Sequence, residues 1–193
     1  MPSNVIKPSS LNLKIEIMLI KRSLFITGLV LLMGGALSAQ DFKYVGAAKC
    51  KMCHNKPYSG EQYNKWKAAP HANALKSLSN EKSLAYAKEN GITDPTKEAR
   101  CLRCHSTVGF IDASLNAGVK VEEGVSCESC HGPGSVYTKI AIMKSHEKGM
   151  ENGLILPEKS VCVGCHNKDN PFHKPFDFDA AVAKINHSFP VAE

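Results

Sequence analysis

The chain has 193 residues, of which 43% are hydrophobic and 22% charged, and its formal net charge is +6 at pH 7. This length is ordinary for one domain, and the eight cysteines are the unusual feature. The lysines and arginines are scattered, without a basic run or a nucleic-acid-binding motif, so binding to nucleic acid is not supported.

Residues 1–39 predict an N-terminal leader with a signal peptide. Met18 is a candidate for the true start, and the cations Lys21 and Arg22, an apolar run over residues 24–33 and small residues up to Ala39 follow it. This is the order of a secretory signal, and the run is too short to favour a membrane-spanning helix. We expect export, cleavage near residue 39, a mature domain over residues 40–193 and no stable membrane insertion after cleavage. An uncleaved anchor is the alternative.

Four copies of the unit Cys-x-x-Cys-His use all eight cysteines. They are Cys50, Cys53 and His54; Cys101, Cys104 and His105; Cys127, Cys130 and His131; and Cys162, Cys165 and His166. In the attachment site of c-type haem, both thiols form thioethers with the porphyrin and the adjoining imidazole binds the iron. Zinc sites and disulfides also use paired cysteines, but neither requires a histidine directly after the second one. We therefore predict four covalently attached c-type haems.

We expect a mainly α fold, with short helices and loops wrapped around the four haems and little or no sheet. Each porphyrin is a large apolar body, so haem would replace much of the peptide core. Helices are expected from a capping box at Ser59–Gln62 through Trp66, after Pro70, over residues 80–90, from Asp94–Pro95 into the second motif, over residues 136–148 and from about Asp177. Residues 110–124 are expected to be irregular, with at most a short strand at residues 119–121.

Four histidines lie outside the motifs: His71, His146, His173 and His187. Four haems and four spare histidines suggest a second imidazole on each iron. We predict His71, His146 and His187 as such metal ligands, in addition to the motif histidines His54, His105, His131 and His166. A buried, hydrogen-bonded histidine is the alternative for His71, and Met143 or Met150 could replace His146. His173 is expected in an exposed turn.

The order of these features resembles the tetrahaem cytochrome c-554 family. The most specific part is the run Gly124-Val125-Ser126-Cys127-Glu128-Ser129-Cys130-His131-Gly132-Pro133-Gly134, and the resemblance also uses Tyr44-Val45-Gly46, Trp66, Gly109-Phe110 and the first two motifs. It implies that His71 ligates the haem of His166, His146 that of His54 and His187 that of His131. The haem of His105 would then be five-coordinate, unless His173 closes it within the chain or from a neighbouring molecule.

The function expected from these features is electron transfer between redox partner proteins in the bacterial cell envelope. The periplasm is the expected location, and the outer surface or the extracellular space is the alternative. A second hypothesis is an enzyme that reduces a nitrogen oxide such as nitric oxide, bound as a small-molecule ligand at an open haem of His105. A third is a subunit of an extracellular haem filament. The sequence identifies no catalytic residue, so an electron carrier is preferred to an enzyme.

Overall fold

The structure is a computed structural model in which residues 41–189 are described. The chain divides after Gln40 into two units, and the description concerns the second, which starts at Asp41. The predicted leader and its cleavage site therefore lie outside the described residues. Among residues 41–189, no helix combines the length and the apolar character needed to cross a bilayer.

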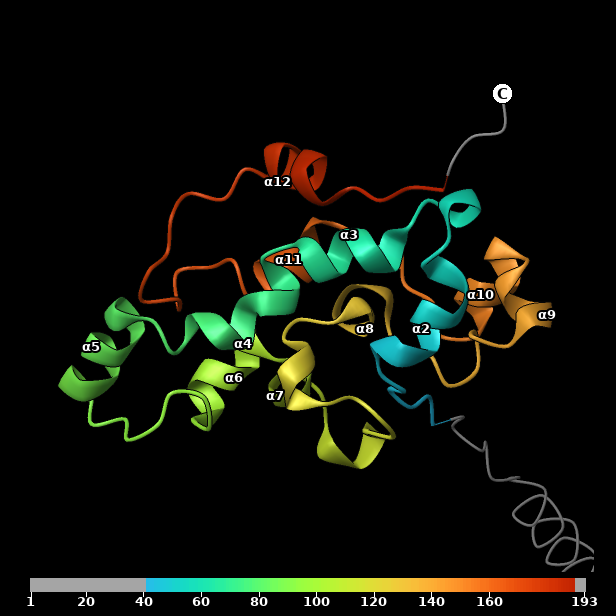
Figure 1. The fold of residues 1–193 in the computed structure, drawn as a ribbon. Helices are drawn as coiled ribbons and strands as arrows, with labels where there is room; N and C mark the ends of the chain where they lie inside the picture. Colours follow the sequence, from blue (N-terminus) through green and yellow to red (C-terminus); the bar gives the residue numbers. More distant parts are fainter. Residues whose placement is uncertain (1–40, 190–193) are drawn as a thin grey trace, which may run out of the picture. The chain divides into compact units, whose positions relative to one another are not determined.

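The described part of the chain is built from short helices and loops, as predicted (Figure 1). The α-helices are α2 (Ala47–His54), α3 (Gln62–Ala68), α4 (Ala74–Ser77), α5 (Glu81–Glu89), α6 (Ala99–His105), α7 (Thr107–Phe110), α8 (Cys127–His131), α9 (Ile140–Met143), α10 (His146–Glu151), α11 (Lys159–Val163) and α12 (Phe178–Ile185). The 3-10 helices are η1 (Pro57–Ser59), η2 (His71–Asn73), η3 (Ala113–Leu115) and η4 (Val121–Glu123). Strand-like pairing among these residues is confined to an isolated parallel bridge between Tyr44 and Asn116.

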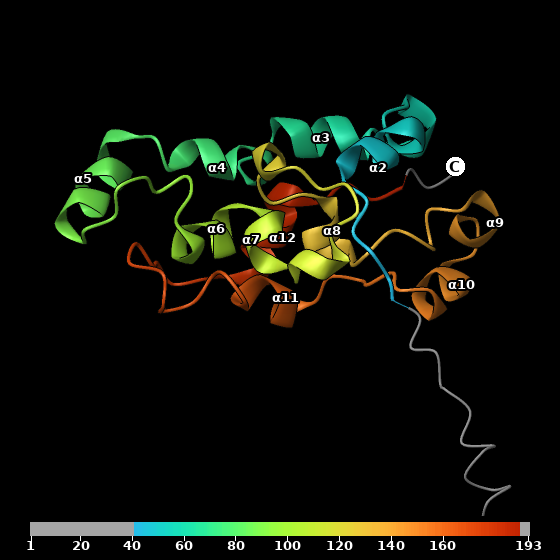
Figure 2. The ribbon, with the colours of Figure 1, turned by 90° about the horizontal axis from the view of Figure 1, so that it is seen from below.

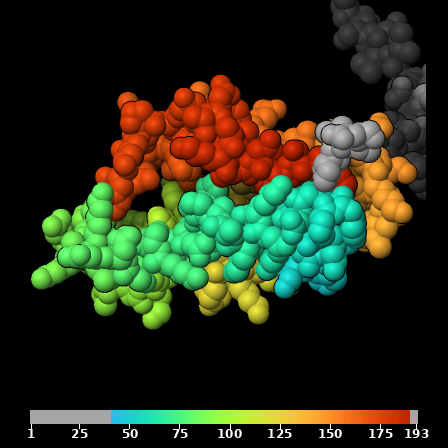
Figure 3. Space-filling view, turned by 45° about the horizontal axis from the view of Figure 1, so that its top comes forward, coloured from blue at the N-terminus to red at the C-terminus, as the bar shows by residue number. Residues whose placement is uncertain are grey.

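The helices of this unit lie in rows. Figure 2 shows α2, α3, α4 and α5 along one side and α10 and α11 along the other, with α6, α7 and α8 between them. The C-terminal segment that carries α12 runs back along the side of α3 (Figures 1 and 3). The rows place the four Cys-x-x-Cys-His motifs, on α2, α6, α8 and α11, around the middle of the unit.

The peptide core is small for a chain of this length. Only seven apolar residues of the described part are buried, and three of them are alanines: Ala47, Ala72, Leu78, Ala87, Ile92, Val119 and Tyr137. Within residues 41–189, eleven large apolar side chains are exposed, among them Met52 (66%), Ile140 (68%) and Phe189 (60%). Burial of apolar surface is the main force that offsets the conformational entropy of the chain, so this polypeptide needs another apolar body to fold around.

Two predicted helices are confirmed at their starting residues. Helix α5 begins after Asn80, whose side chain accepts a hydrogen bond from the Ser83 N–H at 2.9 Å, and Gly91 follows it with φ 66°. Helix α12 begins after Asp177, whose side chain accepts a hydrogen bond from the Ala180 N–H at 3.0 Å. Its end differs from expectation, because α12 stops at Ile185 and His187 lies in the extended segment beyond it.

Other expected helices are shorter or begin later. The capping box is wrong: α3 begins at Gln62, and Ser59 belongs to η1. The stretch from Asp94 is a turn, and α6 begins only after Glu98. The segment after Pro70 is a 3-10 turn followed by the one-turn helix α4.

The helix expected over residues 136–148 is divided. Residues Ile140–Met143 form α9, and α10 starts at His146. Between them Ser145 caps α10 by accepting a hydrogen bond from the Lys148 N–H at 3.3 Å. Because serine competes for backbone hydrogen bonds, it favours a cap over a helix interior.

Candidate haem-binding site

Three of the Cys-x-x-Cys-His motifs end a short helix, and the fourth begins in one. Helices α2, α6 and α8 end at His54, His105 and His131, and α11 ends within the fourth motif at Val163. In a helix, residues three apart lie on the same face. The first three motifs therefore present both thiols to one side and the histidine at the last turn, as attachment to one porphyrin edge requires.

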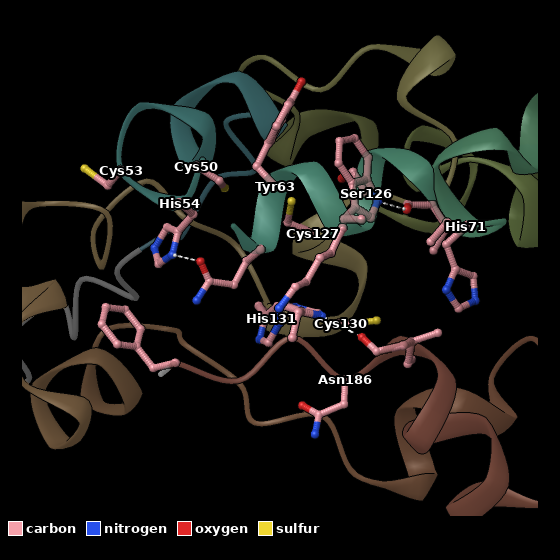
Figure 4. A pocket seen from close by; sticks show the side chains of 18 of the residues that line it. Cys50, Cys53, His54, Tyr63, His71, Ser126, Cys127, Cys130, His131 and Asn186 are labelled. Atoms are coloured by element: carbon pink, nitrogen blue, oxygen red, sulfur yellow. Dashed lines mark hydrogen bonds between the residues drawn. The ribbon is translucent and has the colours of Figure 1, made fainter. Parts of the chain in front are cut away.

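The first and third motifs share one cavity of about 800 Å³ (Figure 4). The thiols and imidazoles of both motifs line it. The neighbouring Cys127 thiol lowers the pKa of Cys50, the Cys50 thiol raises that of Cys127, and both residues line the cavity, so the two attachment sites adjoin. Three further predicted ligands also line this cavity: His71, His146 and His187.

Glu128, inside the third motif, fixes the start of the helix that carries the first motif. Its side chain is 1% exposed. The carboxylate accepts hydrogen bonds from the N–H groups of Val45 (2.9 and 3.0 Å), Gly46 (2.7 Å) and Gly134 (2.6 Å). Burial raises the pKa of Glu128, and these N–H donors oppose the rise because they favour the ionised form.

Glu123 extends the same contact by accepting from the Ala47 N–H at 3.0 Å. Two carboxylates thus satisfy N–H groups at the beginning of α2, which no intrahelical bond can satisfy. Sequence reasoning missed both roles, because the partners lie 76 to 83 residues away in the chain.

The second and fourth motifs form another pair. The Cys165 Sγ lies 3.9 Å from the Arg103 carbonyl oxygen, and burial, followed by the neighbouring Cys104 thiol, raises the pKa of Cys165. The third and fourth motifs are also close: burial, and to a smaller extent the Cys162 thiol, raises the pKa of Cys130. The attachment sites therefore adjoin in the order first, third, fourth and second.

Two pairs of histidine rings face one another across the site. His71 and His166 have ring centroids 6.1 Å apart and planes at 77°, and His131 and His187 have centroids 6.0 Å apart and planes at 82°. A separation of about 6 Å is what two imidazoles show when each nitrogen lies about 2 Å from a shared metal ion. Both pairs join a motif histidine to a histidine distant in the chain.

Partial burial favours the metal-binding form of three imidazoles in these pairs. It lowers the pKa of His71, His131 and His166, and the neighbouring histidine lowers that of His71 and His131 further. A neutral imidazole has a free nitrogen lone pair for a metal, whereas imidazolium has none.

The backbone of Gly124 and Val125, just before the third motif, holds His71 in place. Its carbonyl oxygen accepts from the Val125 N–H at 3.0 Å, and the Val125 carbonyl accepts from the Trp66 indole N–H at 2.8 Å. Gly124 has φ 65°, and a Cβ there would lie 2.7 Å from the His71 carbonyl oxygen. A glycine is therefore required at residue 124 for this close approach.

The Nδ1 atoms of three motif histidines have separate partners. His54 Nδ1 lies 3.3 Å from Gln62 Oε1, and His131 Nδ1 lies 3.3 Å from the Ile155 carbonyl oxygen. His105 Nδ1 lies 2.8 Å from the Ala74 carbonyl oxygen and 3.1 Å from the Ser77 hydroxyl. Such partners fix the tautomer and leave Nε2 for the metal. The sequence carried no signal for them.

The fourth motif histidine is positioned by stacking. The ring of Phe176 lies 4.7 Å from that of His166, at 20° between the planes. Phe176 belongs to the loop that leads into α12, so this loop orients the imidazole opposite His71.

Three further histidines, His146, His105 and His173, are not part of the two ring pairs. His146 lines the cavity beside His54, and Met143 lines it too, so both candidates stay open. Within residues 41–189, His105 has no second imidazole at the separation of the two ring pairs. His173 is exposed in a turn closed by its own N–H and the Asn170 carbonyl at 2.9 Å, as the sequence predicted.

The described residues fit haem. Helices hold the first three motifs, the imidazole pairs leave space for a metal, and the apolar core is too small for the chain alone. All eight cysteines are free thiols. These features define a multihaem c-type cytochrome.

Comparison with known proteins identifies the family. Residues 49–132 match the family model described as cytochrome c554 and c-prime. The chain is 32% identical over 165 residues to cytochrome c-554 of Nitrosomonas europaea, across 81% of this chain. The chain belongs to the cytochrome c554 family, as the resemblance in its sequence predicted, and it spans 63% of that relative's length.

A solved structure is also similar. It is the reduced state of cytochrome c554 from Nitrosomonas europaea, with 24% sequence identity and a TM-score of 0.48 over 76% of this chain and 79% of the other.

Proposed function

We propose that this protein is a tetrahaem cytochrome that carries electrons between redox partner proteins in the periplasm of a bacterial cell. The adjoining attachment sites, in the order first, third, fourth and second, support this proposal best. Four haems held by these motifs would lie close enough for electrons to pass through the chain. The predicted signal peptide supports the location.

The haems would supply one-electron chemistry, and the chain's own residues would hold and tune them. The motif cysteines attach each group, and His54, His105, His131 and His166 bind the iron from one side. His71 and His187 would bind opposite His166 and His131, and His146 opposite His54. An iron with two imidazoles exchanges an electron with little rearrangement of its ligands. Gln62, Ile155, Ala74 and Phe176 orient the motif imidazoles, which sets their basicity.

The test is haem content combined with redox titration of the exported holoprotein. We expect four haems per chain from the pyridine haemochrome spectrum and the intact mass, and fully reversible reduction in several steps. Cell fractionation and the N-terminal sequence test the periplasmic location and the cleavage near residue 39. Fewer than four haems, or irreversible reduction, would overturn the proposal.

A second candidate function is reduction of a small nitrogen oxide such as nitric oxide at the haem of His105. The observation that favours it is the absence, among residues 41–189, of a second imidazole beside His105, whose own Nδ1 is fixed by Ala74 and Ser77. An iron with one open face could bind a small molecule.

Electron paramagnetic resonance of the oxidised holoprotein separates these functions. An axial high-spin signal that changes with nitric oxide or cyanide supports the open haem. Only low-spin signals would exclude it, with His173 as the additional ligand. Sedimentation at high concentration then distinguishes His173 of the same chain from His173 of a neighbour, because a monomer argues against the filament.

A further inference from the structure

The charge of this protein is divided unevenly along the chain. Residues 42–80 contain seven lysines and one acidic residue, Glu61, which gives a net charge of +6. Residues 81–193 contain thirteen basic and fifteen acidic residues, a net charge of −2. The positive segment comprises α2, α3 and α4, which form one continuous band in Figure 3.

Five of these lysines surround the first haem motif. We call them the lysine face: Lys49, Lys51, Lys56, Lys65 and Lys67, all exposed on or between α2 and α3. The ion pairs in the described part of the chain are Lys97–Asp94 and Arg100–Glu98, so no carboxylate neutralises this face there. Its charge is therefore available to a partner.

The lysine face adjoins the cavity that the first and third motifs share. Lys49 and Lys65 line that cavity together with Cys53 and His54. Lys51, Lys56 and Lys67 do not line it. The Lys51 Nζ lies 5.5 Å from the centroid of the Tyr63 ring, which connects α2 to α3 across the face.

We propose that the lysine face is the docking surface for an acidic redox protein, which exchanges electrons with the haem of the first motif. This inference rests on the proposed electron-transfer function. A positive patch around an attachment site attracts an acidic partner and accelerates the encounter, and its influence falls with ionic strength. It also places the partner beside one end of the chain of attachment sites.

The lysines could instead neutralise the carboxylates of the haem itself. The triple variant Lys51→Glu, Lys56→Glu and Lys67→Glu avoids this ambiguity, because these three side chains lie outside the cavity lining. The matched control is Lys88→Glu, Lys120→Glu and Lys159→Glu, which changes the net charge equally at exposed lysines elsewhere.

The first measurement is the oxidation rate of the reduced holoprotein by hexacyanoferrate(III), an anion that takes one electron from the protein and becomes hexacyanoferrate(II). In the face variant we expect the rate to fall about tenfold at low ionic strength. At an ionic strength of about 0.5 M the difference should be less than twofold. The control variant should fall much less than the face variant. Equal rates in the two variants would overturn the docking surface.

The second measurement is binding of poly-L-glutamate, an acidic polypeptide, by isothermal titration calorimetry. We expect binding by the unaltered holoprotein and by the control, and none by the face variant. A lowered haem content in the face variant would assign the lysines to the haem and overturn the inference. Stronger binding to phosphatidylglycerol vesicles than to poly-L-glutamate would replace the protein partner with a membrane surface. A holoprotein that transfers no electron to hexacyanoferrate(III) would refute the proposed function itself.

Discussion

The Glu128 carboxylate accepts a hydrogen bond from the Gly46 N–H at 2.7 Å, and these residues are 82 positions apart. One belongs to the third haem motif, and the other precedes the helix of the first. Their contact explains how two distant motifs come to line one cavity. It also places a carboxylate in the interior, and a buried carboxylate is stable only when its oxygens are hydrogen-bonded.

Glu128→Gln should therefore destabilise the holoprotein. One oxygen would remain to accept, while the amide NH₂ would face backbone N–H donors, and an unsatisfied buried donor costs about 1–3 kcal/mol. Glu128→Ala should cost more, because all three N–H groups lose their acceptor. Guanidinium denaturation followed by circular dichroism measures the free energy of unfolding. The exposed Glu122→Gln is the control, and equal stability of the two Gln variants would contradict the role of Glu128.

Gln62 should tune the reduction potential of the haem bound by His54. Its Nε2 donates to the Ser59 carbonyl, which directs Oε1 to His54 Nδ1. Gln62→Glu should lower that potential, since a carboxylate increases the basicity of the imidazole, and Gln62→Leu should raise it. Spectroelectrochemistry resolves the shift. The exposed Asn64→Leu on the same helix should leave all potentials unchanged, and an unshifted Gln62→Glu protein would exclude the effect.

His187→Ala should convert one low-spin haem to high spin, because its ring is the partner of His131 at 6.0 Å. His71→Ala should do the same for the haem of His166. Electron paramagnetic resonance provides the measurement, with the exposed Asn64→Ala as the unchanged control. If the His187→Ala spectrum matches that of the unaltered protein, His187 is not a ligand.

The double variant Cys127→Ser with Cys130→Ser should be exported but should misfold. The third motif shares its cavity with the first and adjoins the fourth, so loss of its haem removes a large part of the core. The yield of soluble, protease-resistant protein in the periplasm checks this. A stable product with three haems would show that the haem of this motif is dispensable for folding.

Asp94 should contribute stability that depends on pH. Its hydrogen bonds to Thr96, at 2.6 Å from the hydroxyl, and its ion pair with Lys97 lower its pKa below 3.8. The contribution is present above the unfolded pKa and is lost as pH falls through the lower folded value. Asp94→Asn should therefore be less stable than the unaltered protein at pH 7, with the difference shrinking at about pH 3. A constant difference over that range would contradict this assignment.

The sequence predicted the haem motifs, the helical class and the two helices with strong caps at Asn80 and Asp177. These features depend on residues that are neighbours in the chain, so they can be predicted from the sequence. The expected helix over residues 136–148 failed because Ser145 begins a new helix, and the capping box failed because Gln62 turns to His54. The first error comes from a local cap at Ser145 that the apolar pattern does not show, whereas the second comes from a contact at a haem motif that overrides local preference.

The roles of Glu128, Glu123 and Phe176 could not have been predicted from their positions in the sequence. Glu128 occupies a variable position of the haem motif and contacts residues more than 80 positions earlier. Phe176 lies in a loop that local rules describe only as irregular. Such contacts become visible only when the three-dimensional arrangement of the motifs is known.

The pairing of the first motif with the third, and of the second with the fourth, has a consequence for biosynthesis. A chain that crosses the membrane from its N-terminus presents the first attachment site long before Cys127 arrives to complete the shared cavity. The early haems would therefore be attached to a polypeptide that has not yet closed around them. This order would leave each motif accessible to the attachment machinery, and compaction would begin once residues 124–134 emerge and bring the third motif to the first.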